Sequence, residues 1–460
     1  MSERTAEVVI CGAGIAGISA AYHLTVNFGV RDVLLVDEGS PLSLTSDKST
    51  ECYRNWWPGP GSAMVELMNR SIDILEELAI GTGNGFNLNR RGYLFATADP
   101  DRAQVFRQTA EEAAELGAGP VRFHTGGSGE PTYHPAPPDG FEGQPTGADL
   151  ITDPMMIREH FPYLSPETIA VVHPRRAGWF SAQQLGSLLL DRARQHGARL
   201  EQAHVSAVRK EGDRVAGVDL ETSAGHRSVA SRTFVIAAGP HLRTVGEMIG
   251  VDLPVFSEYH AKVAISDHLG VVPRDAPLLI WSDSQRLPWS AEEKESLAES
   301  DETRWLLDTF PQGVHARPEG PQGSPILLIL WTYHTEAVEP VFPPPVDPEY
   351  PEIALRGLST MIPGLRGYFG RLPKPTVDGG YYTKTQENRP LIGPLPVGGA
   401  YIIGALSGYG LMASPGAGEL LARHIVGHEL PSYASAFSLE RYDDPEYQRL
   451  LKTWRTTGQL

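Results

Sequence analysis

The sequence predicts an α/β (α+β) fold in which a parallel-sheet domain is interrupted by a second domain rich in β-strands. Short, continuous apolar segments, as buried parallel strands require, stand near the start, the middle and the end of the chain. They are Val8–Cys11, Thr233–Ala237 and Tyr401–Gly404. The stretches between them carry further strand-like runs, such as 326–333. A chain of 460 residues is long enough for two or three folding units.

Composition narrows the class of protein. Hydrophobic residues make up 41% and charged residues 21%, and the net charge is 39 − 56 = −17. Such a surface argues against general binding to nucleic acid or to anionic membranes. No run approaches 18 apolar residues, and the polar N-terminus precedes an apolar run too short for a signal peptide. We therefore expect a soluble, cytoplasmic protein.

Cysteine usage excludes two further classes. The chain has only Cys11 and Cys52, which cannot build a disulfide framework or a cysteine-rich metal site. We expect no metal centre.

The first forty residues form a predicted strand–helix–strand unit. The strand Val8–Cys11 runs directly into Gly12–Gly17, a helical pattern follows, and the strand Val33–Val36 ends in Asp37 and Glu38. In a G-x-G-x-x-G turn, Gly12 allows the tight turn, Gly14 lets the backbone approach a pyrophosphate, and Gly17 lets the helix pack on the sheet. The helix N-terminus at Ile15 and Ala16 offers N–H groups to phosphates. The unit predicts a Rossmann-like dinucleotide site.

The acidic residue after the second strand refines this prediction. Asp37 stands 20 residues beyond Gly17, where its carboxylate accepts hydrogen bonds from ribose hydroxyls. It would repel a 2′-phosphate and so disfavours NADP. FAD and NAD share this turn, which leaves the choice between them open.

A second glycine-rich turn near the end of the chain favours a flavin. Ser407-Gly408-Tyr409-Gly410-Leu411-Met412 follows the strand that ends at Gly404 and leads into a helix. A helix N-terminus aimed at a reduced flavin would stabilise its negative charge. A simple packing turn is the alternative.

These residues resemble a known family, the D-amino-acid oxidase family of FAD-dependent oxidoreductases, and within it the sarcosine oxidase, glycine oxidase and dimethylglycine dehydrogenase branch. Four stretches carry the resemblance in the family's order. They are Gly12–Gly17 with Asp37, the loop 45–55, the strand ending Ala237-Ala238-Gly239, and the segment from Tyr382 through Arg389-Pro390-Leu391-Ile392-Gly393 to Gly410.

The resemblance implies the division of the chain and its cofactor contacts. An FAD-binding domain would comprise 1–85, 167–250 and 372–430, and a substrate domain 86–166 and 251–371, with a C-terminal tail at 431–460. Thr45 and Ser46 would contact the pyrophosphate side, Lys48, Ser49 and Thr50 would run beside the isoalloxazine, and Val205 would lie by the adenine. The remaining implied contacts are Glu38, Ala238, Gly239, Gly404 and Ser407 to Met412.

Departures from the family pattern concern the flavin linkage and the substrate. Gly380 stands where monomeric sarcosine oxidases carry the cysteine that bonds the flavin, so we expect FAD without that bond; Cys52 is the one thiol near the predicted ring. Of two family positions that hold a substrate carboxylate, Arg54 is retained and Met412 replaces a lysine. Glu51 replaces an arginine and could meet a cationic amine, or Glu51 and Arg54 could form a salt bridge.

The remaining candidates each have a structural alternative. His260 and His334 are candidate acid–base groups, although a histidine in a strand is often structural. Lys262 is the candidate for assisting O₂ reduction. Six aromatic residues would form a cage for an alkylammonium group or simply fill a core. They are Trp56, Trp57, Tyr259, Trp281, Trp331 and Tyr333.

The sequence therefore predicts an FAD-dependent amine or amino-acid oxidase or dehydrogenase. It would oxidise a C–N bond of a secondary or tertiary amine, or of an amino or imino acid, by hydride transfer to flavin N5, and pass electrons to O₂ or another acceptor. Two alternatives remain: a 2-hydroxy-acid dehydrogenase acting on a C–OH bond, and a non-catalytic flavin-binding redox subunit.

Overall fold

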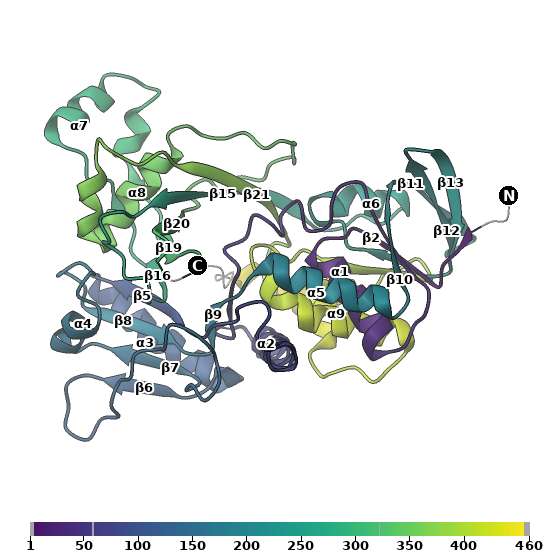
Figure 1. Ribbon diagram of the computed structural model, residues 1–460, viewed down its shortest axis with the longest axis horizontal. Helices are drawn as coiled ribbons and strands as arrows, with labels where there is room; N and C mark the ends of the chain where they lie inside the picture. Colours follow the sequence, from purple (N-terminus) through teal and green to yellow (C-terminus); the bar gives the residue numbers. More distant parts are fainter. Residues whose placement is uncertain (1–3, 58, 322, 455–460) are drawn as a thin grey trace.

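The computed structural model describes residues 4–57, 59–321 and 323–454. The ends of the predicted segments 1–85 and 431–460 therefore lie partly outside the described residues. Two large sheets form two lobes, with the six-stranded sheet on the right of Figure 1 and the nine-stranded sheet on the left.

The six-stranded sheet is assembled from distant parts of the chain. Its strand order is β10(Ala198–Gln202), β3(Val33–Asp37), β2(Val8–Cys11), β14(Phe234–Ile236), β23(Ala400–Gly404) and β22(Leu391–Pro394). The first five are parallel and β22 is antiparallel. β2 and β14 are wholly buried, which explains why their sequences are continuously apolar rather than alternating.

Different layers cover the two faces of this sheet. Val8 and Ile10 pack with the helices α1(Ile15–Tyr22), α2(Ala63–Thr82), α5(Ala182–Gln195) and α9(Gly410–Val426). Val9 and Cys11 pack against the other layer. It consists of α6(Leu242–Met248) and a four-stranded sheet of β1(Arg4–Thr5), β13(Gly225–Ala230), β12(Arg214–Thr222) and β11(His204–Glu211).

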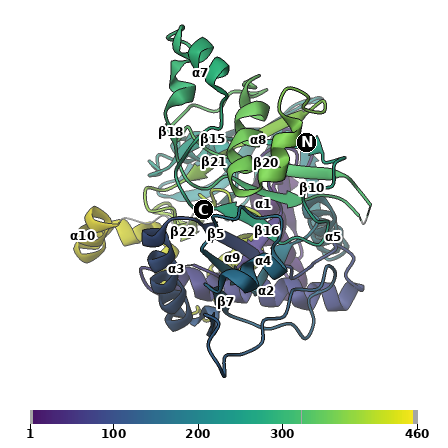
Figure 2. The same ribbon diagram turned by 90° about the vertical axis from the view of Figure 1, so that its left-hand side faces the viewer.

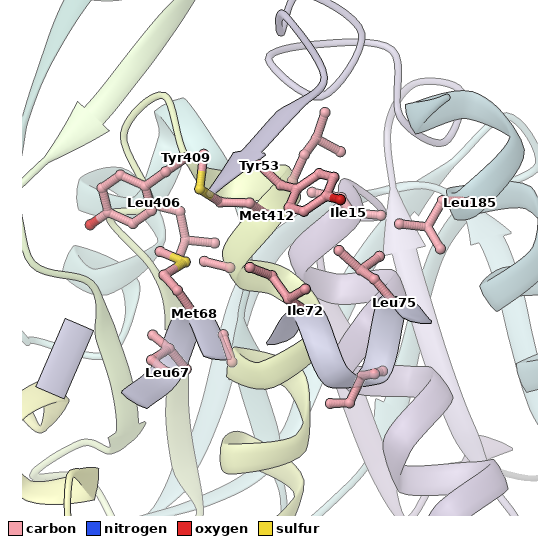
Figure 3. Close-up of a cluster of buried hydrophobic side chains, with 14 of the residues drawn as sticks. Ile15, Tyr53, Leu67, Met68, Ile72, Leu75, Leu185, Leu406, Tyr409 and Met412 are labelled. Carbon is pink, nitrogen blue, oxygen red and sulfur yellow. The ribbon is translucent and has the colours of Figure 1, made fainter. Parts of the chain in front are cut away.

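A buried cluster joins the first and last glycine-rich segments. Figure 3 shows three side chains that meet the apolar side chains of α2: Ile15 from α1, Met412 from α9, and Tyr53 from the segment Cys52–Arg54. Tyr409 and Leu406 extend the same cluster. This core fixes the N-terminal ends of α1 and α9 relative to each other.

The nine-stranded sheet forms the second lobe. Its order is β21(Thr376–Lys384), β15(Phe256–Ser266), β20(Ile326–Leu330), β19(His315–Pro318), β16(Leu278–Trp281), β5(Tyr93–Thr97), β8(Ala170–Pro174), β7(Ala148–Ile151) and β6(Val121–His124). Its accompanying helices are α3(Pro100–Ala113), α4(Pro154–His160), α7(Ala291–Ala298) and α8(Tyr350–Met361). Two small sheets pair β17(Gln285–Arg286) with β18(Thr309–Phe310), and β4(Cys52–Arg54) with β9(Ala177–Trp179).

Three strands differ from the sequence-based expectation, two in the sheet they join and one in where it ends. β8 and β21 belong to the nine-stranded sheet, although the predicted boundaries at 167 and 372 place them in the other domain. The reason is pairing: β8 joins β5 and β7, and β21 pairs with β15 along its whole length. β20 ends at Leu330 rather than at 333, because the Trp331 N–H donates to the Tyr350 hydroxyl (2.9 Å) outside the sheet.

The segment after α9 folds back on the parallel-sheet lobe. Arg441, between α9 and α10(Pro445–Thr453), donates to the buried Glu387 carboxylate at 2.8 Å. Tyr442 and Tyr447 donate to the same oxygen, each at 2.8 Å. α10 itself projects at the left of Figure 2.

Across the described residues, none of the helices combines the length and the apolar character that a membrane crossing demands.

Candidate active site

The first glycine turn divides its glycines between packing and ligand approach. Gly12 has φ +113°, and a Cβ there would lie 2.3 Å from the Ala237 carbonyl oxygen. A Cβ on Gly17 would lie 2.0 Å from the Gly12 carbonyl oxygen. A Cβ on Gly14 would meet only the Ser46 hydroxyl, at 3.4 Å, and Gly14 lines a cavity. Gly12 and Gly17 therefore permit the fold, and Gly14 leaves backbone exposed to a ligand.

The Asp37 carboxylate is held in place at this cavity. Oδ2 accepts from the Ala13 N–H at 2.7 Å, and Oδ1 accepts from the Gly39 N–H at 2.8 Å. Each oxygen keeps a second lone pair, which suits it to accept a hydroxyl hydrogen bond. Glu38 also lines the cavity and pairs with His204 at 3.1 Å.

A long cavity, which we call the dinucleotide cavity, runs along the carboxyl ends of the parallel strands. One half is lined by Asp37, Glu38, Val205 and Ala238. Gly14, Thr45, Ser46 and Gly239 line both halves. The second half continues along Ile15, Ala16, Ser49, Gly404, Ser407, Gly408, Gly410 and Leu411. Two connected halves beside a phosphate-type turn suit a dinucleotide.

The second glycine turn is conformationally strained. Ala405 and Ser407 have φ values of +53° and +47°, which cost energy in residues that carry a Cβ. A Cβ on Gly408 would lie 2.4 Å from the Tyr382 ring. Gly408 is therefore needed so that Tyr382 can pack against the turn.

Gly380 and Cys52 define the possibilities for a covalent bond. A Cβ on Gly380 would lie 3.0 Å from the Cβ of Lys48 and 3.4 Å from the Cα of Thr45, so this strand faces the loop 45–55. Lys48 pairs with Asp47 at 2.8 Å and with Asp378 at 3.0 Å. Burial raises the pKa of the Cys52 thiol to about 11, which keeps it protonated and unreactive near neutral pH.

A second cavity, which we call the inner cavity, adjoins the dinucleotide cavity. Tyr382 and Gly408 line both. Arg54 is buried in its wall, where its Nε donates to the Trp56 carbonyl at 3.0 Å. Its guanidinium lies over the rings of Trp57 (4.9 Å) and Tyr93 (5.5 Å). Thr50, Tyr409 and Met412 also line the inner cavity.

Several polar residues of the inner cavity were missed by the sequence analysis, and three of them join one hydrogen-bond network with His260. Glu258 on β15, Lys384 on β21 and Thr332 after β20 all line it together with His260. Glu258 Oε2 is 2.6 Å from Lys384 Nζ and 3.1 Å from His260 Nε2, and His260 Nδ1 is 2.7 Å from Thr332 Oγ1. The spacing Glu258-x-His260 could have revealed Glu258, because alternate residues of a strand share a face.

Glu51 takes the structural role that the sequence left open for it. Its Oε1 accepts from the Ala182 N–H at 2.8 Å, and its Oε2 pairs with Arg317 at 3.1 Å. Arg317 is buried and also donates to the Thr50 carbonyl at 2.8 Å. Glu51 thus ties the loop 45–55 to β19, and its partner is not Arg54.

The aromatic candidates are divided among two cavities and two buried cores. Trp57 lines the inner cavity, whereas Tyr259, Trp331 and Tyr333 line a separate outer cavity together with His334. Trp281 is buried in the core of the nine-stranded sheet lobe, and Trp56 in the core of the parallel-sheet lobe. The structure therefore does not gather the six residues into one cage, and it separates His334 from His260.

Lys262, on β15, contacts the loop 45–55, which we call the cofactor loop. Its Nζ donates to the carbonyl oxygens of Asp47 and Ser49, each at 3.2 Å. Burial lowers its pKa. The position is next to the segment that lines the dinucleotide cavity at Ser49.

Comparison with known proteins defines the family. The family model described as FAD dependent oxidoreductase (DAO) matches residues 7–424. The chain therefore belongs to this family of FAD-dependent oxidoreductases. It is 26% identical over 465 residues to mitochondrial dimethylglycine dehydrogenase of Mus musculus, covering 98% of this chain and 45% of that protein. The human counterpart is 25% identical over 473 residues, with the same coverage. The chain thus spans less than half the length of these relatives.

Solved structures show the same fold. L-proline dehydrogenase from P. horikoshii superposes with a TM-score of 0.72 at 20% identity, covering 96% of this chain and 98% of that chain. Glycine oxidase from Geobacillus kaustophilus gives 0.70 at 18% identity, covering 96% and 99%.

The residues present fit the family's cofactor, FAD. The bare backbone of Gly14, the N-terminal end of α1 and the fixed Asp37 carboxylate suit a pyrophosphate and a ribose. Val205 lines the same half of the cavity as Asp37. Ser49, Thr383 and the turn at Gly408 would line the isoalloxazine end of the cavity.

Proposed function

We propose that this protein oxidises a C–N bond of a secondary or tertiary amine, or of an amino or imino acid, with non-covalent FAD. One observation carries the proposal. The inner cavity brings a buried arginine and a buried histidine–carboxylate pair together, and it shares Tyr382 and Gly408 with the dinucleotide cavity. A substrate there would meet polar groups on one side and the flavin on the other.

The chain's own residues would bind and orient the substrate. Arg54 offers a guanidinium for a substrate carboxylate, and its place over Trp57 and Tyr93 keeps its head fixed. Met412 and Leu330 give the cavity apolar wall that excludes water from the reacting carbon. When bound, FAD would supply the two-electron acceptor for oxidation of the substrate.

The relatives support this class of reaction. Dimethylglycine dehydrogenase and glycine oxidase are named for tertiary and primary amino acids, and L-proline dehydrogenase for a cyclic secondary one. These substrates share an amine next to a carboxylate-bearing carbon, which suits a cavity with one buried arginine. The acceptor of the electrons would be O₂ or another oxidant.

Anaerobic bleaching of the flavin tests the proposal. The FAD-loaded protein would be mixed with secondary and tertiary amines, amino and imino acids, and 2-hydroxy acids, and the absorbance near the flavin maximum followed. Rapid bleaching by an amine-containing compound is expected. Bleaching by hydroxy acids alone would assign C–OH oxidation, and no bleaching by any of them would favour a non-catalytic flavoprotein.

A further inference from the structure

The Glu258 carboxylate is shared between a lysine and a histidine inside the inner cavity wall. Glu258, His260 and Lys384 are all buried. Burial alone would raise the pKa of Glu258, but hydrogen bonds from His260 and Lys384 outweigh it and hold that pKa below its usual value. Glu258 is therefore a carboxylate, which can only accept hydrogen bonds.

This assignment fixes the tautomer of His260. Because Glu258 Oε2 only accepts, the ring nitrogen facing it at 3.1 Å, Nε2, carries the hydrogen. In the neutral imidazole, Nδ1 then bears the lone pair and accepts from the Thr332 hydroxyl at 2.7 Å. The basic nitrogen of His260 is thereby directed at a hydroxyl that also lines the inner cavity.

We propose that Glu258 and Lys384 are positioning residues for His260, which removes the proton of a substrate ammonium through the Thr332 hydroxyl before the C–N bond is oxidised. The inference rests on the proposed function. The ammonium N–H bond breaks and its proton passes to Thr332 Oγ1, while the Thr332 proton passes to His260 Nδ1. The substrate keeps the freed electron pair on nitrogen, and the imidazolium is stabilised by Glu258. No oxidant is consumed in this step.

Two opposing charges tune the imidazole. Glu258 on β15 favours its protonated form, and Lys384 on β21 disfavours it. The other groups that face it are Tyr382, stacked on it at 4.0 Å, the Thr332 hydroxyl, and His315 on β19. Burial lowers the pKa of His315 to about 4, so this neighbour is uncharged near neutral pH. Burial is the largest influence on His260 and lowers its pKa, which leaves it unprotonated and ready to accept a proton.

The pH dependence of kcat/KM tests the positioning role. Glu258→Gln removes the anion that favours protonated His260, so the pKa of His260 should fall. The acidic limb of the profile, where kcat/KM drops as His260 becomes protonated, should then move to lower pH by about one unit, and the weaker base should give a slower rate. Lys384→Met removes the cation, so the limb should move to higher pH by about one unit. Glu295→Gln and Lys294→Met, on the exposed helix α7, are matched charge controls and should leave the limb in place. Shifts of the same sign, or no shift, would overturn the proposal.

The Thr332 relay has its own pair of variants. Thr332→Ser keeps a hydroxyl and should retain most of kcat, whereas Thr332→Val removes it and should lower kcat about 10²- to 10⁴-fold, the range that general base catalysis contributes. Equal rates in the two variants would exclude the relay.

A measurement without substrate separates this inference from the proposed function. The ring ¹⁵N resonances of His260 in the FAD-loaded protein, assigned with His260→Gln, should show the Nε2–H tautomer and a titration displaced by Glu258→Gln. An Nδ1–H tautomer, or a titration that ignores Glu258, would overturn the positioning role even in an active amine oxidase. If the NMR spectra show the expected tautomer but the protein oxidises no amine, the proposed function would be overturned. The substrate could then not be the proton donor.

Discussion

The ring of His260 lies flat against the ring of Tyr382, with centroids 4.0 Å apart and planes 18° apart. Tyr382 in turn packs so closely on Gly408 that a Cβ there would lie 2.4 Å from its ring. One aromatic side chain thus connects the imidazole of the inner cavity to the glycine turn of the dinucleotide cavity. If His260 accepts a proton as proposed, this stack would set its distance from a flavin bound at the turn.

Replacement of Gly14 by valine should abolish flavin binding. Gly14 has an ordinary φ of −70°, so the branched side chain would not strain the backbone but would fill the space for the pyrophosphate. The purified variant should be colourless, because it would lack the visible absorbance of bound flavin. Gly81→Val, where a Cβ meets nothing within 4 Å, is the control. A yellow Gly14→Val protein would move the cofactor site elsewhere.

FAD should be released from the protein by acid precipitation. Gly380 provides no thiol, and Cys52 is buried with its Sγ donating to the Thr50 carbonyl at 3.3 Å. Its raised pKa of about 11 leaves little thiolate to attack a flavin. The supernatant should carry the yellow colour. Colour that stays in the pellet and disappears in Cys52→Ser would contradict this.

Arg54→Met should impair substrates that carry a carboxylate. A charge-assisted hydrogen bond at this buried site is worth about 1.5–3 kcal/mol, so kcat/KM should fall about 10- to 150-fold. Methionine keeps much of the apolar bulk against Trp57 and Tyr93. An amine without a carboxylate is the internal control and should be affected little. Equal losses for both substrates, with FAD fully bound, would mean that Arg54 is structural.

Lys262→Met should slow reoxidation of the reduced flavin more than its reduction, if O₂ is the acceptor. The ammonium lies against the cofactor loop through the Asp47 and Ser49 carbonyls, and a positive charge there would assist the formation of a superoxide-like anion. Stopped-flow mixing of reduced protein with aerated buffer measures the step. Slow reoxidation of the unsubstituted protein, with fast turnover on an artificial acceptor, would identify a dehydrogenase.

Stability should fall as the pH drops below about 6.5, in part because of His173. Burial lowers the pKa of His173 to about 3, while the same group titrates near 6.5 when unfolded. Between these values the unfolded chain binds more protons, so acid favours unfolding by up to about 1.4 kcal/mol per pH unit for this residue. Urea unfolding of His173→Gln, whose amide can replace the bonds to Tyr133 and the Arg91 carbonyl, should show a weaker dependence. An unchanged dependence would exclude His173.

The cofactor half of the site was predictable because its signals are local. Val8 to Glu38 contain a strand, a turn, a helix and a second strand within one continuous stretch. The spacing of the three glycines in the turn indicates the steric role of each one. The structure brings these residues to one cavity with the late turn at Gly408. Family membership confirms the fold class and the cofactor.

The inner cavity was harder to predict because its members meet by long-range pairing. Glu258 and Lys384 pair across β15 and β21, and nothing near either residue in the sequence indicates the other. Strand parity separates the candidates on β15: His260 faces the inner cavity, so its neighbour Tyr259 faces away. The assignment of roles to these residues stays a prediction.

The order of strands in the six-stranded sheet has a consequence for how the protein is made. β2, β14 and β23 are adjacent, yet they come from residues 8–11, 234–236 and 400–404. During synthesis, β14 emerges long before β23 can pair with its free edge, and such edges invite aggregation. A chain interrupted before residue 400 would expose that edge and lack the turn at Gly408. Translation must pass residue 410 before a bound cofactor can stabilise what has already folded.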